Sequence, residues 1–102
     1  MPNPATAELR QESPGRLKLS GEICFQTSPN LLRLSRGYFS GASTLEISMS
    51  SVSRVDSSAV ALMLEWYRQA KAEDINMSFI ELPEALLDLL RVFNLESRLP
   101  VR

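Results

Sequence analysis

The sequence contains no histidine, and it contains a single cysteine, Cys24. Without histidine, the chain lacks the side chain that most often moves protons near neutral pH and most often binds metals. A Ser-His-Asp triad is therefore excluded. A single cysteine excludes an internal disulfide and a cysteine-rich zinc site, and it is compatible with a reducing compartment. We interpret Cys24 as a small buried hydrophobic residue rather than a reactive thiol.

Long apolar runs and an excess of charge are also missing. No window approaches the roughly 18 consecutive apolar residues of a membrane-spanning helix. The first residues, MPNPATAELRQESPG, lack the basic and apolar regions of a signal peptide. We therefore expect a cytoplasmic protein that does not span a membrane. Eleven basic and twelve acidic residues leave a net charge of -1, which argues against a nucleic-acid partner.

The sequence also lacks the patterns of common catalytic sites. Neither a Walker A motif nor the glycine pattern of dinucleotide-binding proteins occurs. The acidic residues are scattered over several predicted elements and form no paired-carboxylate site. We therefore predict a protein that is not an enzyme, with no catalytic residues, no cofactor and no metal.

What is present is enough for one folded unit. A chain of 102 residues with 44% hydrophobic content can build one compact domain with one core. Residues 1–15 contain three of the six prolines, and we predict a flexible leader or an edge strand around residues 7–11. Residues 16–102 are predicted to form a single domain.

The periodicity of apolar residues predicts alternating strands and helices. Three strands are expected, over 16–20, 44–49 and 76–82. The first continues over 23–25 after a bend at Gly21, and the second extends to residue 54. Three helices are expected: one begins near Ser28, one runs over 57–72, and one begins near Pro83. Gly37 and Gly41 should interrupt the first of them. This order predicts an α/β layer in which helices cover a small mixed sheet.

The polar residues that open the segment SRVDSSAVALMLEWYRQA, residues 53–70, allow two interpretations. Asp56 or Ser57 fits the N-cap of the helix, where a side-chain oxygen accepts hydrogen bonds from free backbone amides. Serines at the positive end of a helix dipole also suit a phosphate or a partner surface. Both interpretations are compatible with each other.

The apolar residues of the same helix form a broad face. At 100° per residue, nearly half of its circumference is apolar, and we expect that face to be buried; its members are Ala59, Val60, Met63, Leu64, Trp66, Tyr67 and Ala70. Leu62 lies outside this arc. Leu62 and Trp66 are one turn apart, which predicts a small apolar patch in which the aromatic ring anchors an interface. The alternative, that a neighbouring helix or the tail covers both, is left open.

Three segments together resemble a known family. LSGE at residues 19–22, SSVSRVDSSAVALML at 50–64 and FNLESRLP at 93–100 are similar to the STAS domain, the fold of bacterial anti-sigma-factor antagonists. The similarity is closer to the small STAS subunits of phospholipid-transport ABC complexes, and it spans residues 16–101. It implies a small mixed sheet of about four strands covered by about three to four helices.

The resemblance also implies a site. In this family the hydroxyl residue after the Asp of the SRVD segment is the functional Ser or Thr, and this position falls on Ser57. It is phosphorylated in members that regulate sigma factors, and in the transporter subunits it belongs to the surface that meets the ATPase. The implied partner-binding residues are Asp56, Ser57 and Ser58, to which we add Leu62 and Trp66. Ser58 and Ala59 depart from the family pattern, which often has glycines there.

Two functions follow as expectations. The first is a non-catalytic STAS subunit, peripheral to the inner membrane, that binds and stabilises or regulates the ATPase of an ABC transporter and, through the ATPase, contacts the permease. Such a complex maintains the lipid asymmetry of the outer membrane. The alternative is an anti-sigma-factor antagonist that is switched by phosphorylation of Ser57. The sequence leaves open whether the chain forms a homo-oligomer or touches lipid.

Overall fold

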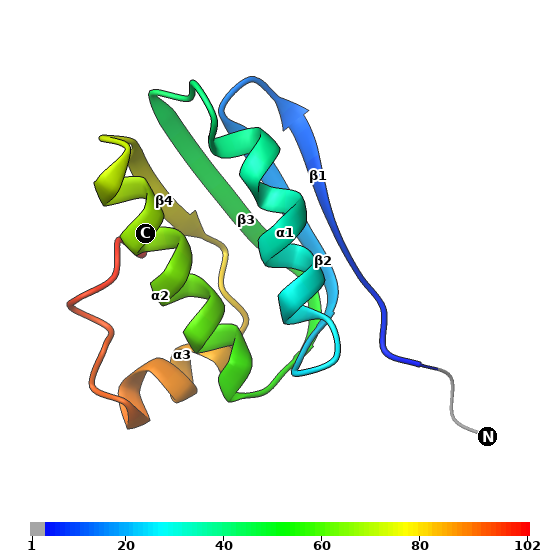
Figure 1. The fold of residues 1–102 in the computed structure, drawn as a ribbon. Helices are drawn as coiled ribbons and strands as arrows, with labels where there is room; N and C mark the ends of the chain where they lie inside the picture. Colours follow the sequence, from blue (N-terminus) through cyan, green and yellow to red (C-terminus); the bar gives the residue numbers. More distant parts are fainter. Residues whose placement is uncertain (1–3) are drawn as a thin grey trace.

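A four-stranded sheet forms the framework of the chain, for which a computed structural model describes residues 4–102 (Figure 1). The strands lie in the order β1-β2-β3-β4. β1 pairs antiparallel with β2, whereas β2 with β3 and β3 with β4 are parallel pairs. The expected α/β fold with a small mixed sheet is confirmed. The strands are β1 (Ala7–Ser13), β2 (Arg16–Ile23), β3 (Thr44–Val55) and β4 (Asn76–Ile80).

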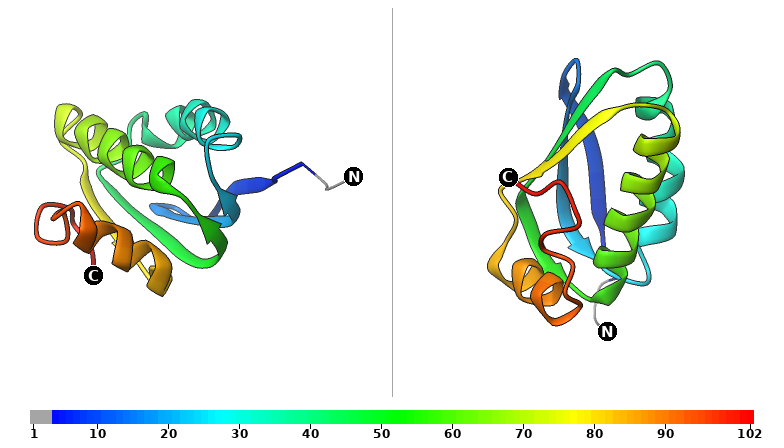
Figure 2. Two further views of the ribbon diagram at one scale, coloured as in Figure 1. Left: turned by 90° about the horizontal axis from the view of Figure 1, so that it is seen from below. Right: turned by 90° about the vertical axis from the view of Figure 1, so that its left-hand side faces the viewer.

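Two helices connect the parallel strands and cover one face of the sheet (Figures 1 and 2). α1 (Ser28–Phe39) joins β2 to β3, and α2 (Ser57–Ala72) joins β3 to β4. Parallel neighbouring strands require such crossover connections, because a tight turn would make the second strand antiparallel to the first. Since both helices begin after the carboxyl ends of adjacent strands, their N-termini meet at the same end of the sheet. α1 continues through Gly37, which we had expected to interrupt it.

The third helix and the C-terminal tail lie beside β4 (Figure 2). α3 (Glu84–Val92) follows the N-cap residue Pro83, and Asn94, directly after the C-cap residue Phe93, adopts a positive φ of 58°. The tail then returns to the sheet, where Phe79 N donates to Pro100 O over 2.8 Å and Arg102 N donates to Phe79 O over 2.9 Å. The tail therefore covers the outer edge of β4.

The N-terminal segment forms the opposite edge of the sheet. For residues 1–15 the sequence allowed a leader or an edge strand, and within the described residues Ala7–Ser13 form β1. β1 packs closely over Gly21, which has a φ of 90°. A Cβ atom at this position would lie 2.4 Å from the carbonyl oxygen of Thr6. The glycine of the LSGE segment is therefore required by both backbone conformation and space.

The core lies between the sheet and the two crossover helices, and the orientation of α2 differs in part from the expected one. Leu64 was expected in the core but is 39% exposed, and Tyr67 is only half-buried. The expectation for Leu64 was wrong because periodicity defines a wide apolar arc without showing which flank meets a neighbouring helix. In the structure α1 packs along the other flank and covers it. The buried residues of α2 are Ser58, Ala59, Val60, Leu62, Met63, Trp66 and Ala70.

Candidate functional site

The carboxylate of Asp56 organises the start of α2. Asp56 is the N-cap residue, and its Oδ1 accepts from Ser58 N over 2.8 Å and from Ser58 Oγ over 2.5 Å. Its other oxygen, Oδ2, accepts from the backbone N–H of Phe25 over 3.2 Å. The capping interpretation of Asp56 is confirmed, and the same side chain also ties α2 to the loop between β2 and α1.

The hydrogen bonds to Asp56 favour its ionised form. Burial raises the pKa of Asp56, but the hydrogen bonds from the Ser58 hydroxyl, from the Ser58 backbone and from the Phe25 backbone together outweigh it. The pKa is therefore held below its ordinary value of 3.8. Asp56 carries a negative charge throughout the physiological pH range.

A second set of hydrogen bonds closes the β2–α1 loop onto α2. Ser28 Oγ lies 2.9 Å from Ser58 Oγ and 2.8 Å from Cys24 O. Because the Ser58 hydroxyl donates to Asp56, the single proton of Ser28 is donated either to Ser58 Oγ or to Cys24 O. Thr27 Oγ1 donates to Glu22 O over 2.7 Å and accepts from Cys24 N over 3.0 Å. Through Thr27, Ser28, Asp56 and Ser58, these hydrogen bonds connect the β2–α1 loop to the start of α2, and we call this region the corner.

The two serines of the DSS segment have different environments. Ser58 is 7% exposed, and its hydroxyl is shared between Asp56 and Ser28. Ser57, the first residue of α2, is exposed, and the side-chain hydrogen bonds found among residues 4–102 do not include its hydroxyl. Of the two, only Ser57 presents its hydroxyl to an approaching molecule, whereas Ser58 supports the corner from within.

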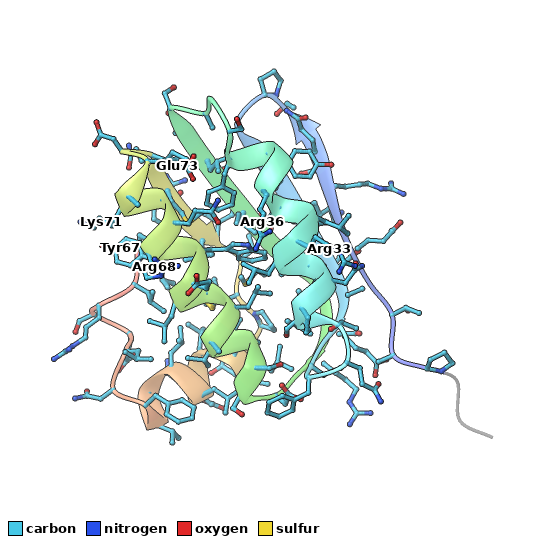
Figure 3. All side chains as sticks on the ribbon, in the orientation of Figure 1. Arg33, Arg36, Tyr67, Arg68, Lys71 and Glu73 are labelled. Atoms are coloured by element: carbon cyan, nitrogen blue, oxygen red, sulfur yellow. The ribbon has the colours of Figure 1, made fainter. Side chains whose placement is uncertain are left out.

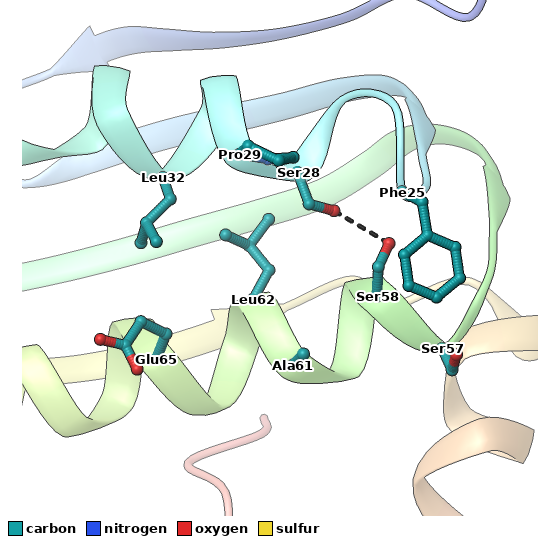
Figure 4. A pocket seen from close by; sticks show the side chains of 9 residues that line it. All are labelled: Phe25, Ser28, Pro29, Leu32, Ser57, Ser58, Ala61, Leu62 and Glu65. Carbon is teal, nitrogen blue, oxygen red and sulfur yellow. Dashed lines mark hydrogen bonds between the residues drawn. The ribbon is translucent and has the colours of Figure 1, made fainter.

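An apolar groove opens beside Ser57, between the N-terminal halves of α1 and α2 (Figure 4). Its volume is about 460 Å³. Figure 4 shows the Ser28–Ser58 hydrogen bond at one end and Leu32 facing Leu62 across the gap. The groove is lined by Phe25, Ser28, Pro29, Leu32, Ser57, Ser58, Ala61, Leu62 and Glu65.

Phe25 is a site residue that the sequence reasoning missed. We had expected residues 23–25 to continue a strand, but β2 ends at Ile23 and Phe25 lies in the following loop, where it is 71% exposed. The helix start at Ser28 did not exclude that strand, because a loop of two residues can connect a strand to a helix. An aromatic ring held open to solvent by a hydrogen-bonded loop is typical of a binding surface.

The surface patch predicted at Leu62 and Trp66 is wrong. Trp66 has 0% exposure, and its Nε1 donates to Ser35 Oγ over 2.8 Å inside the core. It therefore cannot contact a partner in this structure. Leu62 is 4% exposed, although its side chain forms part of the groove wall. The physical reason is that α1 packs against this flank of α2, which is the alternative that the sequence left open.

The structure also bears on metals and on membrane spans. Among residues 4–102, there is no group of three or more Cys, Asp or Glu side chains placed to hold a metal ion. In the same part of the chain, no helix combines the length and the apolar character needed to cross a bilayer.

Comparison with solved structures identifies the fold. An anti-sigma factor antagonist from Mycobacterium paratuberculosis superposes with a TM-score of 0.79 at 19% identity, covering 99% of this chain and 87% of that one. The unphosphorylated anti-sigma factor antagonist SpoIIAA has a TM-score of 0.75 at 14% identity, covering 95% and 86%. SpoIIAA from Bacillus in the phosphorylated form has a TM-score of 0.71 at 14% identity, covering 95% and 89%.

Comparison of sequences identifies the family. No curated protein sequence matches the chain significantly. The model of the family described as "Mlab, STAS domain" matches residues 6–101, which is nearly the whole chain. The chain therefore belongs to the MlaB-type STAS domain family.

Proposed function

We propose that the chain is a non-catalytic STAS subunit that binds the ATPase of a phospholipid-transporting ABC complex and stabilises or regulates it. The observation that carries the proposal is the exposed Ser57 hydroxyl beside an open apolar groove, at the position where family resemblance expects the functional residue. Family membership supports the choice of partner, because the matching family is named after MlaB. The subunit would then lie in the cytoplasm at the inner membrane and would contact the permease through the ATPase.

The geometry of the corner suits a protein partner. Phe25 and the groove provide apolar surface, and Ser57 provides a polar contact at its rim. The hydrogen bonds to Asp56 and Ser28 fix both segments before any partner arrives. A surface that is already ordered loses little conformational entropy on binding, so more of the contact energy appears as affinity.

The exposure of the Ser57 hydroxyl favours a second function. An exposed serine at the first residue of α2 is accessible to a kinase, and the helix dipole stabilises a phosphate at this end. The chain would then act as an anti-sigma-factor antagonist in which the added charge and bulk of the phosphate block binding. SpoIIAA, a structural neighbour described in phosphorylated and unphosphorylated forms, motivates this alternative.

Affinity purification from the native organism distinguishes the two functions. With the chain tagged at the C-terminus, we expect an ABC ATPase and a permease to copurify in stoichiometric amounts. Recovery of an anti-sigma kinase instead, together with a phosphate on Ser57 in the mass spectrum, would support the alternative. Recovery of neither class would contradict both proposals.

A further inference from the structure

The two edges of the sheet differ in what covers them. At the β4 edge the C-terminal tail takes the place of a further strand, through backbone hydrogen bonds between Phe79 and residues 100–102. At the opposite edge, β1 pairs with β2 alone, and no backbone hydrogen bond found among residues 4–102 covers its outer side. Figure 1 shows β1 along the right-hand side of the sheet. An uncovered strand edge readily adds another strand.

The hydrogen bonds between β1 and β2 show which residues of β1 face outward. Glu22 N donates to Thr6 O over 2.9 Å, and these residues lie opposite each other in the register of the two strands. In an antiparallel pair, residues that exchange hydrogen bonds alternate with residues that do not. Every second residue of β1 therefore directs its N–H and C=O groups away from β2, namely Ala7, Leu9 and Gln11.

The first part of β1 has few features that hinder pairing with another strand. Residues 6–11 contain no proline, glycine or lysine, and the bulge of β1 comes only after Gln11. The remaining obstacle is charge, because Glu8 and Arg10 lie on this strand with side chains that are 66% and 73% exposed. Whether these charges repel or attract a second strand depends on the register of the pair.

The charges favour one register for two copies of β1. A two-fold axis at Leu9 places Glu8 of each copy opposite Arg10 of the other. These positions are not hydrogen-bonded across the new pair, so their side chains come closest. An axis at Arg10 would instead place the two arginines opposite each other and Glu8 opposite Glu12. An axis at Gln11 would require regular pairing through the bulge.

We infer that β1 is a homodimer interface, in which two copies of the chain pair their β1 strands antiparallel about a two-fold axis at Leu9. Leu9 of each copy exchanges hydrogen bonds with Leu9 of the other, and Ala7 does so with Gln11. The two sheets then form one continuous sheet. A second copy fits this edge better than an unrelated strand, because one surface supplies both the acidic and the basic member of each pair.

This dimer leaves the proposed docking surface accessible. Figure 3 shows α1, which carries the labelled Arg33 and Arg36, between β1 and α2. The groove beside Ser57 lies between α1 and α2, on the far side of α1 from the β1 edge. Docking and dimerisation therefore use separate surfaces, and either can fail without the other.

Sedimentation equilibrium of the purified full chain, from about 10 µM to about 1 mM, measures the association. A single strand pair buries less surface than a stable dimer needs, so we expect a dissociation constant on the order of 100 µM. Glu8→Arg and Arg10→Glu should each weaken association by about tenfold, because both place like charges opposite each other. Their melting temperatures should stay near that of the parent, since both side chains are exposed.

Restoring the charge pairs should restore the dimer. Glu8→Arg/Arg10→Glu exchanges the two charges and should associate like the parent. An equimolar mixture of the two single variants should also associate, because each then supplies the charge that the other lacks. Arg98→Glu, on an exposed residue of the tail, is the control and should leave association unchanged.

Gln11→Pro tests the strand pairing without changing charge. The N–H of Gln11 points outward, so proline removes a donor from the dimer and none from the ladder with β2. We expect weaker association with little change in melting temperature. If this variant fails to fold, the charge exchange decides.

Three results would overturn the homodimer. The first is a parent chain that stays monomeric at the highest concentration, even if a strand of another protein binds the edge. The second is association that persists undiminished in folded Gln11→Pro. The third is an association that the single charge variants leave unchanged, or that the charge exchange does not restore.

Discussion

Trp66 and Ser35 join the two crossover helices through a buried hydrogen bond. Trp66 Nε1 donates to Ser35 Oγ over 2.8 Å, and Ser35 Oγ donates in turn to Leu32 O over 2.7 Å. Both side chains are fully buried. Trp66 also stacks on Phe79 of β4, with ring centroids 6.4 Å apart. The bond therefore satisfies two polar groups inside an apolar core and fixes the spacing of the helices that form the groove.

Removing either partner of this bond should destabilise the fold. Ser35→Ala leaves the buried indole N–H of Trp66 without an acceptor, which costs about 1–3 kcal/mol. Trp66→Phe loses the hydrogen bond and packing volume, but the Ser35 hydroxyl keeps its bond to Leu32 O. The double variant should cost less than the sum of the two, because the second change removes the orphaned group. Urea unfolding of the four proteins measures this coupling, and strict additivity would show that the bond contributes nothing.

Leu62 and Leu64 should differ strongly in their contribution to stability. Leu62 is buried between α1 and α2, so Leu62→Ala should lower the free energy of unfolding by about 2–5 kcal/mol. Leu64 is far more exposed, and Leu64→Ala should cost about 1 kcal/mol or less. The two residues have the same chemistry on the same helix, which makes each the control for the other. Equal losses in urea unfolding would contradict the orientation of α2.

Asp56 should make stability depend on pH in the acidic range. Because the folded pKa is below the ordinary value of 3.8, the contribution of the carboxylate is complete above that value and is lost as the pH falls through the folded pKa. Asp56→Ala should cost about 1 kcal/mol at pH 7, as expected for a lost N-cap. The difference from the parent should shrink below about pH 4.

Asp56→Asn is the matched control for this pH dependence. Asparagine is also a good N-cap residue, so the helix start should survive while the titrating charge is removed. The variant should therefore lack the component of the acid-induced loss that Asp56 contributes. An identical pH profile for parent and Asp56→Asn would show that another group is responsible.

Ser57→Glu should separate binding from folding. Ser57 is exposed at the positive end of α2, where an acidic side chain is tolerated or mildly stabilising. The melting temperature should stay near that of the parent, whereas affinity for the ATPase should fall through bulk and charge. Ser43→Glu, at an exposed loop position before β3, is the control. Unchanged affinity for Ser57→Glu would place the docking surface elsewhere.

Local patterns in the sequence were sufficient for the elements and their order. α2 begins and ends where the apolar spacing and the DSS cap predicted, because capping and periodicity act within a few residues. The family resemblance likewise identified the STAS fold and directed attention to Ser57, which is exposed. Gly21 was recognised only as a bend, and its contact with Thr6 became visible in the structure.

The sequence by itself determined the α/β class, the strand and helix pattern, and the polar corner at Asp56 and Ser57, since these depend on short-range backbone and capping preferences. Only the tertiary structure decided that Trp66 is buried, that Leu64 is not, and that Phe25 stands exposed beside the groove. These outcomes depend on how α1 and α2 pack together on the sheet. A residue's exposure is set by neighbours distant in sequence, and no local pattern specifies which flank of an amphipathic helix those neighbours cover.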